Sequence, residues 1–195
     1  MMLNRPPAAY RRGSLLARLR HDLAGLEFEP DDDTRGRFRS TAMGLELIAE
    51  EHVEARFLMH IVTTRFSYPI SGDGGALARM RIRHRGAWKR NGIECAVTQG
   101  AEDAAVRDAA ERLAADVALT AALLPLDFTE LELERQTTGW VASLVHYGAS
   151  EVVYQFPSTR QYVRLSPEQV QAILKTFARL RDLMGHRTRT VTASE

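Results

Sequence analysis

Hydrophobic residues change their spacing several times along the chain, and each spacing predicts a different element. Four leucines recur every three or four positions with arginines opposite, and they are Leu16, Leu19, Leu23 and Leu26. This spacing predicts a helix over residues 14–25. Residues 1–12 contain RPP and are expected to form a disordered tail. This start is also arginine-rich and acid-free until Asp22, as transit peptides are, but a tail followed by a docking helix is the simpler interpretation.

Residues 37–97 alternate with a period of two, which predicts strands after a polar loop at EPDDDTRGR. In EARFLMHIVTTRF one face would hold Ala55, Phe57, Met59 and Ile61, and the other Glu54, Arg56, Leu58 and His60. The proline and glycines of SYPISGDGGALA predict a loop. Asn91-Gly92 predicts a tight hairpin, because both residues tolerate the positive φ of a type I′ turn.

Helical spacing returns in residues 102–124 and 166–185. The first helix would pack through a stripe of Ala105, Val106, Ala109, Leu113 and Val117 and end before Pro125. The second begins with Ser166 as N-cap, Pro167 and a capping box completed by Gln169, and it ends at Gly185. Four strands are expected between them, at TELELERQ, WVASLVHYG, EVVYQF and RQYVRL, and residues 186–195 are expected to be a flexible tail.

These elements predict an α+β fold in which helices pack on one face of a two-layer antiparallel sheet. Residues 13–185 would form a single domain. Its order of four strands and a helix occurs twice, over about residues 37–124 and 127–185. Five residues of Leu45–His60 also recur 86 positions later in Leu131–His146. An internal duplication of a β4-α unit is therefore a hypothesis, with coincidence among common residue types as the alternative.

Composition restricts the class of protein. The formal net charge is +1, so no global field attracts nucleic acid or an anionic membrane, and the longest apolar run is too short to cross a bilayer. Lysine occurs only twice among 26 basic residues, and the excess of arginine indicates a bacterial, GC-rich genome. Cys95 is the only cysteine, which excludes a disulfide framework and fits the cytosol best.

Two histidines are the first candidates for chemistry. Residue His60 would lie on the helix-free sheet face with Arg56, and His146 would share a face with Trp140 and Leu144. The pair could act as a general base, but no HxH, HxxxH or HxxE motif accompanies them, so no metal or other cofactor is expected. The simpler interpretation is that both are partly buried scaffold residues.

The second candidate is the arginine stripe of RMRIRHR, which places Arg79, Arg81, Arg83 and Arg85 on one strand face. Arginine forks bind phosphate and carboxylate well, although charged residues on an exposed strand also prevent aggregation. An acidic segment follows, with nine carboxylates between residues 101 and 135 against three arginines. A basic and an acidic patch suit a homodimer, and they equally suit two solvated faces.

Three functions remain from this sequence, in order of preference. The first is a non-catalytic cytosolic binding protein that uses the helix-free sheet face for a small anionic ligand or a protein partner. The second is a small enzyme for an anionic metabolite, with a histidine base and an arginine that holds the anion. The third is nucleic-acid binding through the arginine stripe, which lacks the stacking aromatics such proteins use.

Overall fold

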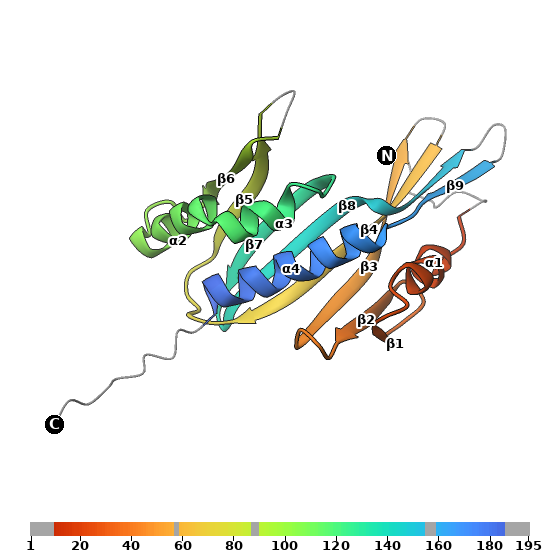
Figure 1. Cartoon of the computed structure of the whole chain (residues 1–195), viewed down its shortest axis with the longest axis horizontal. Coiled ribbons are helices and arrows are strands. Elements are labelled where there is room, and N and C mark those ends of the chain that lie inside the picture. The colour runs from red at the N-terminus through yellow and green to blue at the C-terminus, as the bar shows by residue number, and fades with distance from the viewer. Residues whose placement is uncertain (1–9, 57–58, 87–89, 155–158, 186–195) are drawn as a thin grey trace, which may run out of the picture.

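Two long strands form the centre of the molecule. In the computed structural model, β4 (Met59–Ser71) and β8 (Gly139–Tyr154) pair antiparallel from Met59↔Tyr154 to Ser71↔Gly139. The structure describes residues 10–56, 59–86, 90–154 and 159–185. Within them the fold is α+β, with four helices and one open, nine-stranded antiparallel sheet (Figure 1).

The remaining strands extend this centre on both sides. The sheet order is β1-β2-β3-β4-β8-β7-β5-β6, and β9 pairs with the far half of β8 beyond β7. These strands are β1 (Glu27–Pro30), β2 (Arg35–Ser40), β3 (Leu45–Arg56), β5 (Ala78–Arg85), β6 (Gly92–Gln99), β7 (Phe128–Gln136) and β9 (Thr159–Val163). The sheet therefore joins the N-terminal and C-terminal parts of the chain through β4 and β8.

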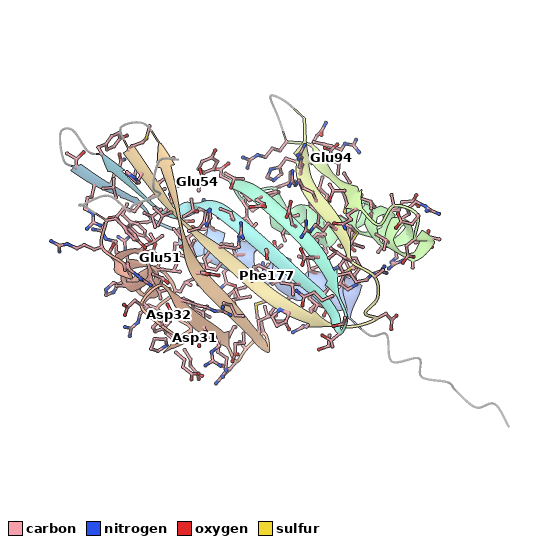
Figure 2. All side chains as sticks on the ribbon, turned by 180° about the vertical axis from the view of Figure 1, so that it is seen from behind. Asp31, Asp32, Glu51, Glu54, Glu94 and Phe177 are labelled. Carbon is pink, nitrogen blue, oxygen red and sulfur yellow. The ribbon has the colours of Figure 1, made fainter. Side chains whose placement is uncertain are left out.

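The four helices lie on one side of the sheet. They are α1 (Ser14–Asp22), α2 (Ala104–Ala115), α3 (Val117–Leu123) and α4 (Pro167–Met184). Figure 1 shows them in front of the strands, and Figure 2, seen from behind, shows the strands in front of the helices. Fully buried side chains of both layers, among them Phe66 on β4 and Phe177 on α4, form one apolar core between them.

The expected order of four strands, helix, four strands and helix is wrong. Within the described residues, six strands precede α2 and three follow α3. The second group is one strand short because β8 contains WVASLVHYG and continues into the predicted strand EVVYQF as far as Tyr154. The structure gives no support for a duplication. The turn in the first segment follows Arg56, whereas the turn in the second follows Gln136, so residues related by the 86-residue offset occupy different places in their hairpins.

Several predicted loops are part of strands or lie elsewhere. β1 and β2 occupy most of the expected polar loop EPDDDTRGR, and β4 continues through Pro69 to Ser71. The β5–β6 connection spans residues 86–91, so Asn91-Gly92 is not the two-residue turn. A disordered tail is predicted for residues 1–12, but Tyr10 donates a hydrogen bond to Glu51 at 2.8 Å. Residues 1–9 and the predicted C-terminal tail, residues 186–195, lie outside the described residues.

The helix predicted for 102–124 is two helices, because Asp116 ends one and begins the next. Its backbone is extended, with ψ of 114°, and its side chain accepts a hydrogen bond from Leu119 N–H at 2.7 Å as the N-cap of α3. Val117, expected in the buried stripe, is therefore 81 % exposed. Within the described residues, no helix has the length and apolar character that a membrane span requires.

Asp116 also joins these helices to α4, which generates a first prediction. Arg179 donates to both of its carboxylate oxygens, at 3.0 and 2.5 Å, and this hydrogen bonding holds the pKa of Asp116 below its usual value. Asp116→Ala should lower the free energy of unfolding in urea at pH 7 by at least the ~1 kcal/mol of a lost N-cap. Asp116→Asn can still cap α3, so its free energy of unfolding should fall less than that of Asp116→Ala. An equal decrease in the two variants would contradict the role of the cap.

Candidate functional site

The predicted site residues separate onto the two faces of the sheet. The four arginines of the stripe lie on the helix-free face of β5, as predicted, because the buried Met80 and Ile82 alternate with them. Residues His60, His146 and Trp140 are all less than 7 % exposed and lie on the helix-covered face. Arg56 ends β3, and its side chain lies outside the described part of the structure. The fold therefore does not bring the histidines to the arginine stripe.

The predicted position of His60 on the helix-free face is wrong for a geometric reason. The chain turns between Arg56 and Met59, so His60 pairs directly with Ala55. Residues that pair directly across an antiparallel ladder share a face. The buried row of β4 is therefore His60, Val62, Thr64 and Phe66, and the predicted face of Met59 and Ile61 is the other one.

Arg79 and Arg81 of the stripe already have partners on the neighbouring strand. Arg79 lies 2.7 Å from a carboxylate oxygen of Glu134, and Arg81 donates through Nε to Glu132 at 2.7 Å. This hydrogen bond raises the pKa of Arg81. Near the opposite edge of the sheet, arginines of β2 form similar ion pairs with Glu29, Asp31 and Glu46. The acidic and basic segments of the sequence thus meet inside one chain, as columns of alternating charge.

Arg83 and Arg85 differ from the other two arginines of the stripe. Across the described residues, neither has an ion pair or a side-chain hydrogen bond, although Arg83 lies directly opposite Glu94 of β6 in the ladder. Both are exposed on the part of β5 that extends beyond its pairing with β7. Among the described residues, both are therefore unpaired cations on the helix-free face.

His146 has a structural role that its contacts explain. The backbone N–H of Asp127 lies 3.0 Å from its Nε2, and the N–H of Gly148 lies 2.8 Å from its Nδ1, so whichever nitrogen carries no proton accepts a hydrogen bond. A neutral imidazole can accept at one of these nitrogens and a protonated ring at neither. Burial also lowers the pKa of His146, so the folded protein holds the ring neutral.

A buried polar cluster around Glu151 lies beneath α1, and His60 lies on the same face of the sheet, two ladder positions from Glu151. Glu151, fully buried on β8, accepts a hydrogen bond from Ser14 at 3.3 Å and lies 3.3 Å from Arg160 of β9 and 3.7 Å from Arg18. His60 Nδ1, Glu151 Oε1 and Arg160 Nε are buried without a hydrogen-bond partner in the structure. Unpaired buried polar atoms are rare, and bound water satisfies them in most folds.

Carboxylates hold both ends of α1 above this cluster. Glu51 of β3 accepts hydrogen bonds from Gly13 and Leu16 N–H at 3.1 and 2.9 Å, which satisfies two free donors at the start of the helix. At the other end, Asp22 accepts from Tyr162 at 2.6 Å and from Leu165 N–H at 2.9 Å. Burial and the hydrogen bond to Asp22 raise the pKa of Tyr162. The polar cluster is thus also the docking site of α1.

A cavity of about 650 Å³ lies between α2, the end of α4 and the start of β8. Trp140 lines it beside Arg135, which is 9 % exposed and whose guanidinium carbon lies 5.8 Å from the centre of the indole ring. The guanidinium of Arg135 is fixed by Ala76 O and Asp103, each at 2.8 Å. Asp103 also caps α2, and its bond to Arg135 holds its pKa below the usual value.

The second cation of the cavity is Arg112 on α2, which is exposed and has no ion pair or hydrogen bond within the described residues. Ala105 and Ala109 leave space beside it, while Leu183 and Met184 supply apolar surface from α4. Asp73 and Asp182 also line the cavity, and Asp182 lies 3.2 Å from Arg181. Nowhere in the described part of the chain do three or more metal-ligating side chains come together.

A family model described as a protein of unknown function, DUF3156, matches residues 21–184. The chain belongs to the DUF3156 family. No curated protein and no solved structure shows significant similarity to it. The match ends at the last residue of α4 and includes every described strand of the DUF3156 protein, all residues that line the cavity except Gly185, and most of the polar cluster.

Sequence reasoning selected Trp140 and His60 but missed the charged residues that surround them. Arg135 occupies the same strand face as the buried Leu131 and Leu133, and Glu151 the same face as Val153. A charge at an apolar position of an alternating strand was the available signal for both. Arg112 had no such signal, because an exposed arginine on a helix is ordinary.

The contacts of His146 predict how the stability of this DUF3156 protein depends on pH. Because its pKa is lowered below 6.5, the unfolded state takes up a proton first as the pH falls. The contribution of the neutral ring is complete above about pH 6.5 and is lost as the pH falls through the folded-state pKa. Urea titrations at pH 7.5 and 5.5 should therefore show lower stability at pH 5.5.

Replacing the ring tests this assignment. His146→Phe should lower the free energy of unfolding at pH 7.5 by about 1–3 kcal/mol, because a buried N–H loses its acceptor. The variant should also show a smaller difference in stability between pH 7.5 and pH 5.5. Part of this difference should remain, because burial also lowers the pKa of His84. His52→Phe, at an exposed position of β3, is the control. An unchanged pH dependence in His146→Phe would refute the assignment.

Proposed function

We propose that this DUF3156 protein is a non-catalytic binding protein, and that its ligand is a small molecule with one anionic group and an apolar part. The observation that supports this most is the cavity of about 650 Å³ that combines the unpaired Arg112 with the ring of Trp140. Binding sites for small molecules are typically concavities of roughly 300–1,000 Å³ with apolar walls and a few polar groups.

The two arginines of the cavity have different tasks in this proposal. Arg135 is already held by Asp103 and Ala76 O, so it positions the indole ring and keeps a positive charge beside it. Arg112 has no side-chain partner among the described residues, and its guanidinium can donate two parallel hydrogen bonds to a carboxylate or phosphate. The apolar part of the ligand would lie against Trp140, Leu183 and the alanines of α2.

The helix-free sheet face supports this function less well than the cavity. Its arginine stripe is partly neutralised by Glu132 and Glu134, so an anion would have to displace a carboxylate at two of the four positions. The same neutralisation weakens the case for nucleic acid, which needs uncompensated cations along its path. A cytosolic location stays part of the proposal, since one half-buried cysteine suits a reducing compartment.

Tryptophan fluorescence provides a direct test. The chain has two tryptophans, so Trp88→Phe leaves Trp140 as the only reporter. We expect a saturable change in its emission with at least one member of a panel of aromatic carboxylates, fatty acids and phosphate monoesters. Arg112→Gln should weaken that binding at least tenfold, because it removes the free cation of the cavity. Arg83→Gln, an equal change of charge on the opposite face, should leave it unaltered.

Two results would refute the proposed site. The first is the absence of any saturable response across the panel at millimolar concentration. The second is a response of equal affinity in Arg112→Gln and in the parent protein, which would place the ligand elsewhere.

A further inference from the structure

Three strands pair with a single neighbour over their whole length within the described residues, and they are β1, β6 and β9. An open edge presents unpaired backbone N–H and C=O groups, which are a template for another strand. Proteins that remain monomeric protect such edges with short strands, prolines or charges that point inward. The three edges of this sheet differ in this protection, and the edge that lacks it is a candidate site for pairing with another strand.

Two of the edges are protected. β1 has four residues, ends in Pro30 and presents Glu27 and Glu29. β9 has five residues, and its Arg160 points inward beneath α1 to the buried Glu151. A strand added to either edge would meet a missing donor or an inward charge.

β6 lacks these features. It has eight residues and no proline, and its one charged residue, Glu94, lies on the outer face, where Figure 2 labels it. The inward row is Ile93, Cys95 and Val97. Ile93 is buried, whereas Cys95 and Val97 are half-buried apolar side chains that pack against the core from its border. The edge thus offers both backbone groups and apolar surface.

The geometry points to a second copy of this chain as the occupant. We propose that β6 pairs antiparallel with β6 of another protomer about a two-fold axis at Cys95. In this register Ile93 lies opposite the partner's Val97, so the apolar row of one strand meets that of the other. Such an isologous contact is self-complementary and closes after two copies.

Charge excludes the neighbouring register centred on Glu94, and the apolar row disfavours the one centred on Ala96, which would place Ile93 opposite the partner's Gln99. A two-fold axis perpendicular to the sheet keeps like faces together, so the register can shift only in steps that preserve the face of each residue. Centring on Glu94 would place two carboxylates opposite each other, which is unfavourable. Centring on Cys95 places Glu94 opposite the partner's Ala96, with the unpaired Arg83 beside Glu94 on β5.

Two substitutions of opposite charge at Ala96 test both the interface and its register. Ala96 is exposed on the outer face, so neither change should disturb the core. We expect the purified full-length protein to sediment as a dimer at micromolar concentration. Ala96→Glu should raise the dissociation constant at least tenfold, because it places a carboxylate against the partner's Glu94 twice. Ala96→Lys should leave the dimer intact or tighten it, because the same positions become ion pairs.

Hydrogen exchange supplies a second measurement in the same samples. Amides of residues 92–99 should exchange more slowly in the dimer than in Ala96→Glu, while those of β1 stay unchanged. The proposal is overturned if the parent protein is monomeric up to 100 μM. It is also overturned if Ala96→Glu dimerises as well as the parent, or if Ala96→Lys and Ala96→Glu weaken the dimer equally. None of these results depends on whether the cavity binds a ligand.

Discussion

The pairing of β4 with β8 is the constraint on which the rest of the structure depends. It joins residues 59–71 to residues 139–154, so neither part of the sheet is complete without the other. The ladder shifts its register between Thr63 and Arg65, opposite Ala149, whose φ of 58° is unusual for a residue with a side chain. Thr64 donates a hydrogen bond to Ala149 O at 2.9 Å there, which satisfies a buried carbonyl where the ladder is interrupted.

That pairing also decides which side chains face the helices. Once His60 and Val153 are opposite each other, alternation assigns the residues of these strands to a face as far as the register shift, and the shift resets the alternation beyond it. The helix side receives the apolar rows, and the other side receives columns of arginine and glutamate on neighbouring strands. Each exposed ion pair in such columns contributes little to stability. Their more important effect is that opposite charges are neighbours, so a chain with 26 basic and 25 acidic residues presents few free cations on this face.

Local patterns predicted the elements well, and the pairing between elements poorly. The capping box of Ser166 and Gln169 and the alternation of β5 needed only neighbouring residues, and both are present. The face of His60 depended on where the chain turns, and the neutralisation of Arg81 depended on β7 lying beside β5. A sequence without aligned relatives does not contain those two facts locally. Asp116 is an intermediate case: it is a good N-cap, but the alanine-rich sequence around it hides the break.

The candidate site shows the same difference between what local patterns predict and what depends on the pairing of distant elements. Trp140 was selected from the sequence because it shares a strand face with His146, whereas its neighbours in the cavity could not be predicted, since they come from α2, β7, α4 and the loop between β4 and β5. Asp103 shows why those elements act together: one carboxylate caps α2 and holds the guanidinium of Arg135 beside Trp140. The start of α2 is thereby fixed to the end of β7. Arg112, about two and a half turns into the rigid helix that Asp103 begins, is consequently held in a fixed position relative to the indole ring. A helix cap thus contributes directly to the geometry of the cavity.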